Sequence, residues 1–253
     1  VEGNSFGARG WYNEVSVATL IWDLWDEADD GVDTGSIGIG PIYETMVGPH
    51  RTGESFATLF SFASGLRGML DAEGAALLDA LLDREQVVSG PALDAWASNE
   101  TNDAGVSLDA LPLYVPYMAD GSVLNVCVNS ELDGFARHGN NVGSNRYLRI
   151  TVPNDDEYDV SIVTTTPITP TADPDEFDYS DPDIYAIRGA GPENVADGTT
   201  DLVQNAEPVF RTPLLRASET YIAFLEEWRY QDRLAATTFP QRVCFDVSLT
   251  PTP

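Results

Sequence analysis

Carboxylates are the side chains of this sequence best suited to chemistry, and they are densest between residues 173 and 183. This short stretch contains six acids, Asp173, Asp175, Glu176, Asp178, Asp181 and Asp183. Calcium is bound by about six to eight oxygens, largely carboxylates and carbonyls. The spacing therefore predicts a calcium site, with ligands from Asp173, Asp175, Asp178, Asp181 and Asp183. A solvated acidic loop is the alternative interpretation in so acidic a protein.

The two cysteines lie in similar surroundings. Cys127 stands between Val126 and Val128, and Cys244 between Val243 and Phe245, so each belongs to a segment of alternating apolar residues. We expect them to form a disulfide that joins the first and last predicted strands of the second half, in an oxidising compartment. Two separate buried thiols are the alternative.

The histidines do not have the spacing of a zinc site. His50 and His138 are 88 residues apart and neither is followed by Glu, whereas the H-E-x-x-H motif needs both histidines on one helix. The sequence also lacks a G-x-S-x-G motif and a Gly-rich phosphate loop. We expect no zinc and no peptidase activity from this chain alone. Glu14 and His50 are the candidates for a catalytic role, and both are weak ones.

The charge of the chain limits its partners. The net charge is −28, and all 13 basic residues are arginine. Such a surface repels nucleic acid and anionic lipid, and it favours solubility in salt. No apolar run is long enough to span a membrane. We expect a secreted or extracellular protein, processed at its N-terminus.

The first half of the sequence predicts helices. Apolar residues at Val17, Leu20, Ile21, Leu24 and Trp25 mark one face of a helix that begins after Asn13 and ends near Ala28, with Gly31 beyond it. Residues 31–54 predict a long Gly-rich loop that contains His50. Further helices are expected at 54–70, at 72–84 after the cap Asp71, and from Pro91 to Trp96.

The second half predicts strands. Alternating apolar residues and turn signals indicate at least seven strands, at 122–129, 146–153, 157–165, 183–187, 207–212, 220–226 and 242–249. This pattern is typical of a sandwich or jelly roll. We therefore expect an α+β protein of two domains. An all-α lobe would span residues 1–105, and an antiparallel, jelly-roll-like β-sandwich would span residues 106–253.

The segment from Asn13 to Asp26, N-E-V-S-V-A-T-L-I-W-D-L-W-D, resembles a known family. It is similar to a late helix of secreted gluzincin-type zinc metallopeptidases, including the fungalysin-like ones, which reads roughly E-V-W-A-x-x-L-W-[DE] and packs beside the zinc site. The resemblance covers about twenty residues. In a gap-free register, Trp11 falls where those peptidases have a histidine. The resemblance implies that the zinc-binding helix belongs to an upstream segment of the same precursor.

A second resemblance covers roughly residues 145–249. The strand segment with Asp181, Asp183, Ile184 and Tyr185 matches D-x-D-L-Y of the bacterial pre-peptidase C-terminal domain. That family is an accessory β-sandwich, often attached to secreted peptidases. The two resemblances imply the distal part of a secreted metallopeptidase, with an accessory domain for substrate or surface binding. A non-catalytic extracellular module, in which the sandwich binds polysaccharide or protein, is the alternative.

Overall fold

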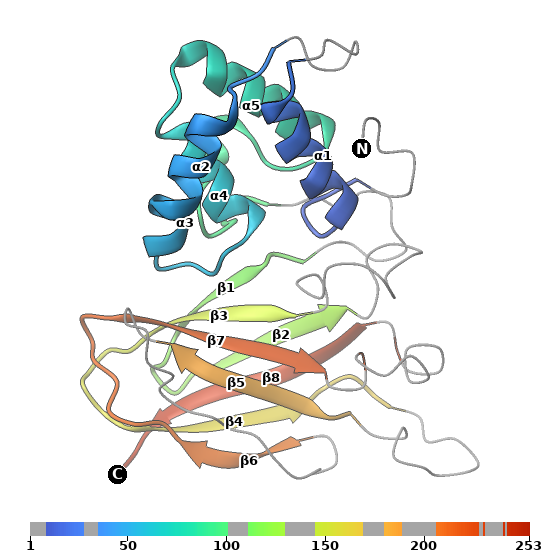
Figure 1. Ribbon diagram of the computed structural model, residues 1–253. Coiled ribbons are helices and arrows are strands. Elements are labelled where there is room, and N and C mark those ends of the chain that lie inside the picture. Colours follow the sequence, from blue (N-terminus) through green and yellow to red (C-terminus); the bar gives the residue numbers. More distant parts are fainter. Residues whose placement is uncertain are drawn as a thin grey trace. The chain divides into compact units, whose positions relative to one another are not determined.

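The computed structural model describes residues 9–27, 35–100, 111–129, 145–168, 180–188, 206–227, 230, 240 and 242–253. These residues divide into two compact units, one of helices up to Pro112 and one of strands from Leu113 onward (Figure 1). The fold is therefore α+β, with the sheets in the C-terminal part.

The helical unit contains α1 (Glu14–Trp25), α2 (Ile39–Val47), α3 (Pro49–Thr52), α4 (Leu59–Arg67) and α5 (Ala72–Arg84) among its described residues. A single 3-10 turn, Gly90–Ala92, replaces the helix expected from Pro91 to Trp96. Helix α1 packs against α5, and α4 packs against α2, α3 and α5. The interior is built from residues that water does not reach, among them Leu20, Leu24, Phe60, Leu66, Leu78 and Leu82.

Helix α1 begins as predicted but buries a different face. The Asn13 side chain caps it by accepting from the backbone N–H groups of Val15 and Ser16. The helix ends at Trp25 rather than near Ala28, since Asp26 adopts an extended conformation and accepts a hydrogen bond from the Trp22 indole at 2.9 Å. The buried side chains are Ser16, Thr19, Leu20, Asp23 and Leu24, whereas Ile21 and Trp25 are exposed.

The expectation of one long loop over residues 31–54 was wrong, because α2 and α3 lie within it. Pro41 stands in the first turn of α2, and Pro49 is the first residue of α3, where a missing backbone N–H costs nothing. Helix α4 starts later than predicted, at Leu59, with a capping box between Thr58 and Ser61. Helix α5 has the predicted bounds and the predicted cap, Asp71.

The second unit has two four-stranded sheets in the described part of the chain. One has the order β1-β3-β7-β5 and the other β2-β8-β4-β6, so consecutive strands always belong to different sheets (Figure 1). The bounds are β1 (Tyr114–Met118), β2 (Val123–Asn129), β3 (Arg146–Thr151), β4 (Tyr158–Thr164), β5 (Pro182–Arg188), β6 (Ala206–Arg211), β7 (Thr220–Glu227) and β8 (Arg242–Pro251). Seven of these match the predicted strands to within two residues.

A single apolar core fills the space between the two sheets. Its members come from both sheets and include Leu148 and Ile150 of β3, Leu225 of β7, and Phe245 and Val247 of β8. The alternation read along residues 146–153 is therefore correct, with Leu148, Ile150 and Val152 facing inward. On the other face, the rings of Tyr114, Tyr147 and Phe224 form a row with neighbouring centroids 5.4 and 5.5 Å apart.

Strand β1 was not predicted, and it pairs with β3 in parallel, so that sheet is not purely antiparallel. Pro116 lies within β1 and interrupts the apolar pattern. Proline has no backbone N–H to donate to a neighbouring strand, so within sheets it is found mainly on edge strands. Strand β1 occupies the edge of its sheet.

Candidate functional site

His50 lies in α3, where it contacts two residues of α4. Its Nδ1 is 3.0 Å from the Ser61 hydroxyl, and its ring packs edge-on against Phe62 with centroids 6.0 Å apart. Burial lowers the pKa of the imidazole below its ordinary value. The same hydroxyl accepts from the Thr58 N–H in the capping box, and Ser61 is buried. His50 thus braces the start of α4.

A serine–histidine pair could in principle serve nucleophilic catalysis, but this one lacks the remaining parts. Catalysis of that kind needs an accessible hydroxyl and a group that orients the base. Ser61 is only 5% exposed. Within the described ranges, no carboxylate is hydrogen-bonded to His50.

Glu14 is the first residue of α1 and is exposed. Its position one residue after the Asn13 cap places a negative charge at the positive end of the helix dipole, which is favourable. No hydrogen bond or ion pair links Glu14 to His50 or to any other described residue. The two catalytic candidates are therefore not brought together as one site.

The predicted calcium ligands Asp173, Asp175 and Asp178 lie outside the described residues. Asp181 and Asp183 are described, at the start of β5. The Asp181 backbone N–H donates to Glu227 at 2.8 Å, and Ser180 donates to the other oxygen of that carboxylate at 2.5 Å. Over the described ranges, no group of three or more His, Cys, Asp or Glu side chains is placed to hold a metal ion.

Cys127 of β2 and Cys244 of β8 stand opposite each other and are joined by a disulfide. The two strands are neighbours in one sheet, so the bond does not depend on opposite ends of the sandwich meeting. In the part of the chain that the structure describes, no helix is long and apolar enough to cross a membrane.

A buried charged cluster in the helical unit was missed by the sequence analysis. Arg84, at the end of α5, binds Asp23 of α1 through its terminal nitrogen and Glu85 through its Nε at 3.0 Å. Burial lowers the pKa of Arg84, but the hydrogen bonds and charges of Asp23 and Glu85 outweigh this effect and raise it above its ordinary value. One feature of the sequence could have indicated this cluster: Asp23 lies between Leu20 and Leu24, on the apolar side of α1.

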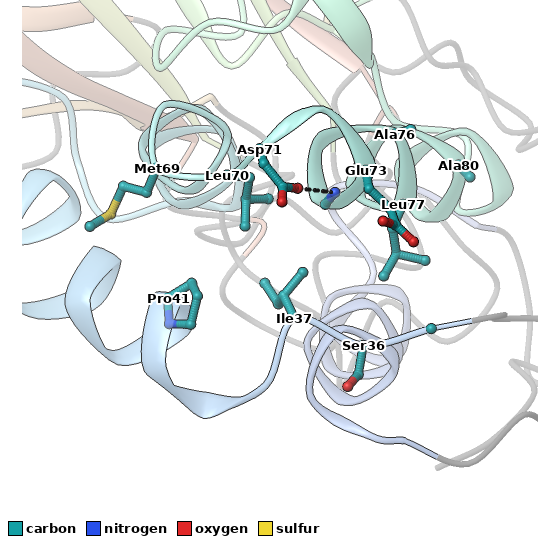
Figure 2. A pocket seen from close by; sticks show the side chains of 12 residues that line it. Ser36, Ile37, Pro41, Met69, Leu70, Asp71, Glu73, Ala76, Leu77 and Ala80 are labelled. Atoms are coloured by element: carbon teal, nitrogen blue, oxygen red, sulfur yellow. Dashed lines mark hydrogen bonds between the residues drawn. The ribbon is translucent and has the colours of Figure 1, made fainter.

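The helical unit also contains a pocket of about 790 Å³. It is lined by the segment 35–37, by Pro41 of α2, and by residues between Met69 and Ala80. The backbone N–H of Ile37 donates to the Leu24 carbonyl at 2.9 Å, which attaches the first of these segments to the end of α1. Figure 2 shows Leu70 and Leu77 pointing toward Ile37 across the hollow. The titratable side chains of its lining are the carboxylates of Asp71 and Glu73.

Comparison with known proteins gives no relative. The chain matches no family model, no curated protein and no solved structure.

Proposed function

We propose that the chain is the distal portion of a secreted metallopeptidase-like protein and is not catalytic by itself. In this proposal the helical unit is a lobe that packs beside a zinc-binding helix supplied by an upstream segment. The β unit is a jelly-roll-like accessory domain of the pre-peptidase type, which binds substrate or a surface. The protein is extracellular.

The observation that carries this proposal is the way α1 folds. The residues of the peptidase-like segment form one continuous helix that is held by its cap at Asn13 and by the buried Asp23. Its N-terminal end presents the exposed carboxylate of Glu14. A helix of this kind is anchored in its own unit and still offers a polar end to a neighbouring segment.

The coding sequence upstream of Val1 provides the first test. We expect it to encode an H-E-x-x-H helix. The longer product should then bind one zinc per chain and cleave casein, whereas the 253-residue chain should do neither. In the longer product, Glu14→Gln should lower activity, and Glu54→Gln, an exposed acid of the same unit, should not. An upstream sequence without the motif, or stoichiometric zinc on the present chain, would contradict the proposal.

The two-domain organisation has its own test. Residues 1–112 and 113–253, expressed separately, should each unfold in a single cooperative transition. If neither part folds alone, the units are not independent domains.

A non-catalytic binding module is the second candidate function. The pocket of about 790 Å³ favours a ligand-binding role for the helical unit, whereas the sequence predicted that the sandwich holds the ligand. In that case, the upstream sequence would lack the zinc motif, and the isolated chain would retain polysaccharide or protein ligands. The presence or absence of the zinc motif in the upstream sequence distinguishes the two, and binding of extracellular polysaccharides to the immobilised chain at physiological salt then tests the ligand class.

A further inference from the structure

The C-terminal end of α1 carries two tryptophans at neighbouring positions on its surface. Trp22 and Trp25 are three residues apart, a spacing that brings side chains of one helix together. Their ring centroids lie 4.9 Å apart, and their planes make an angle of 80°. Because the rings are nearly perpendicular, a face of each ring borders the angle between them. A small group in this angle can contact both faces.

The pair is open to solvent rather than part of the core. Trp25 is 45% exposed and Trp22 is half-buried, whereas Leu20 and Leu24 of the same helix are fully buried. Trp25 therefore contributes little to the packing of the helical unit. Its ring can contact a ligand without any rearrangement of the core.

The surroundings of the two rings are negative. The indole N–H of Trp22 donates to the Asp26 carboxylate at 2.9 Å, which holds a negative charge beside the rings. Asp26 is the C-cap of α1, at the negative end of the helix dipole, and the last turn contains no basic residue. The next residue, Glu27, is an exposed acid. Acids at this end are unfavourable for the helix itself, and the complementary ligand is a cation.

The two indoles select the type of cation. Tryptophan is the best aromatic side chain for cation–π attraction, which acts within about 6 Å of the ring centroid. Centroids 4.9 Å apart allow one cation to meet this distance for both rings. A primary ammonium is strongly hydrated, whereas a quaternary ammonium has no N–H group and loses less hydration at a ring face.

We propose that Trp22, Trp25 and Asp26 form a surface site for a trimethylammonium group. Such a group belongs either to a small molecule such as choline or to a trimethylated lysine of another polypeptide, since this chain contains no lysine. The site lies at the opposite end of α1 from Glu14. The inference does not depend on the proposed relation to peptidases.

The test must separate this site from the general attraction of a chain of charge −28 for cations. Choline, ethanolamine and 3,3-dimethylbutanol are titrated into the 253-residue chain at about 0.15 M salt, where distant charges are screened. Ethanolamine has the charge of choline without its methyl groups, and 3,3-dimethylbutanol has the shape of choline without its charge. The NMR signal of the Trp22 indole N–H reports binding at the site itself.

We expect choline to bind with a Kd on the order of millimolar, at least about fivefold more tightly than either analogue. Blocked trimethyllysine, with acetyl and amide ends, identifies the source of the group. Tighter binding of this compound than of choline indicates a polypeptide ligand, and the reverse indicates a small molecule.

Variants at the two ends of the proposed contact locate the site. Trp25→Leu should weaken choline binding about threefold to fivefold, and Trp25→Phe, which retains a weaker ring, should weaken it less. Asp26→Asn retains an oxygen for the Trp22 indole but removes the charge, and it should weaken binding about twofold to threefold. Tyr43→Leu is the matched control and should leave binding unchanged, because Tyr43 is a 62% exposed aromatic residue of the same unit with no ring contact among the described residues.

Circular dichroism verifies that each variant folds. The proposal is overturned if choline binds no more tightly than ethanolamine or 3,3-dimethylbutanol, or if none of the three binds at tens of millimolar. It is also overturned if both folded Trp25 variants bind choline as the unmodified chain does.

Discussion

Cys127 of β2 is the direct cross-strand partner of Cys244 of β8, and the two are joined although 117 residues separate them. Among the described residues, five strands, β3 to β7, lie between them in the sequence. The link therefore fixes the register of two adjacent strands and closes a large part of the β unit into one loop.

This disulfide should contribute strongly to the stability of the β unit. In the chain-entropy model, a loop of this length is worth about 4 to 5 kcal/mol, and loss of a native disulfide typically costs about 2 to 5 kcal/mol. We expect the double variant Cys127→Ala, Cys244→Ala to lose free energy of unfolding in that range in urea. Mass spectrometry of unreduced, alkylated protein should find no alkylated cysteine. Two alkylated cysteines would refute the bond and remove the chemical support for an extracellular location.

The ion pair between Arg84 and Asp23 should contribute more to the free energy of unfolding than the exposed ion pairs do. The side chains of Arg84 and Asp23 are 15% and 5% exposed, and Glu85 beside them is 1% exposed. Arg84→Met leaves two buried carboxylates without their cation, a loss that typically costs about 3 to 5 kcal/mol.

Arg216→Met is the matched control for that variant. Arg216 and Asp155 are 54% and 51% exposed, and a pair of this kind contributes about 0 to 1 kcal/mol. Urea unfolding of both variants measures the contrast. Equal losses would show that the Arg84 cluster is hydrated in solution.

The sequence predicted the strands of the β unit well, but it did not predict which face of α1 is buried. Alternating apolar residues mark a buried strand face, and this alternation located seven strands. In α1, by contrast, Ile21 and Trp25 continue the apolar stripe yet are exposed, while Asp23 is buried. The face of α1 that is buried therefore differs from the predicted face. This orientation of the helix depends on Arg84, which is 61 residues away and provides the partner for the Asp23 carboxylate. Local periodicity does not contain such a contact.

Helix α2 and the pocket also depend on features that local sequence patterns do not reveal. Gly38, Gly40 and Pro41 are turn residues by composition, but Gly38 adopts φ 69° just before the helix and Pro41 stands in its first turn. The pocket draws its lining from three separate segments of the chain, and their meeting depends on tertiary packing rather than on local sequence. Read along the sequence, its two acids are only the N-cap of α5, Asp71, and a first-turn residue, Glu73.

His50 should make stability weakly pH-dependent near neutrality. Its pKa in the folded protein lies below 6.5, because burial disfavours the imidazolium ion. The stabilising contribution is complete above pH 6.5, and it is lost as the pH falls below 6.5 toward the folded pKa. His50→Asn, which retains a polar atom near the Ser61 hydroxyl, should show a smaller change in Tm between about pH 7.5 and 5.5. His138→Gln is the control, and an unchanged pH profile in His50→Asn would contradict this assignment.

The acidic segment from Asp173 to Asp183 is predicted to bind calcium weakly and stabilise the β unit. A ligand that binds only the folded state adds about 2.7 kcal/mol at a hundredfold excess over its Kd. Tm should therefore be higher in millimolar calcium than in chelator at matched ionic strength, which removes the screening effect of salt on the net charge. Asp175→Asn with Asp178→Asn should abolish the difference. An identical Tm in both buffers would favour the solvated loop.

Gly65 allows the close approach of α4 to α2 and α3. A Cβ at Gly65 would lie 3.1 Å from Cγ and 3.2 Å from Cβ of Pro49, and 3.4 Å from Cγ2 of Thr45. The Pro49 ring is rigid, so Gly65→Ala forces the helices apart at a cost of about 1 to 3 kcal/mol, against a gain in helix propensity of about 1 kcal/mol. We expect a net loss of about 1 kcal/mol in free energy of unfolding. Gly68→Ala is the matched control, because Gly68 has right-handed helical backbone angles and a Cβ there would lie 3.5 Å from its nearest neighbour, the Gly65 carbonyl oxygen; it should be neutral or stabilise the unit by up to about 1 kcal/mol. If both variants were stabilising, α4 would not pack on Pro49 as closely as described.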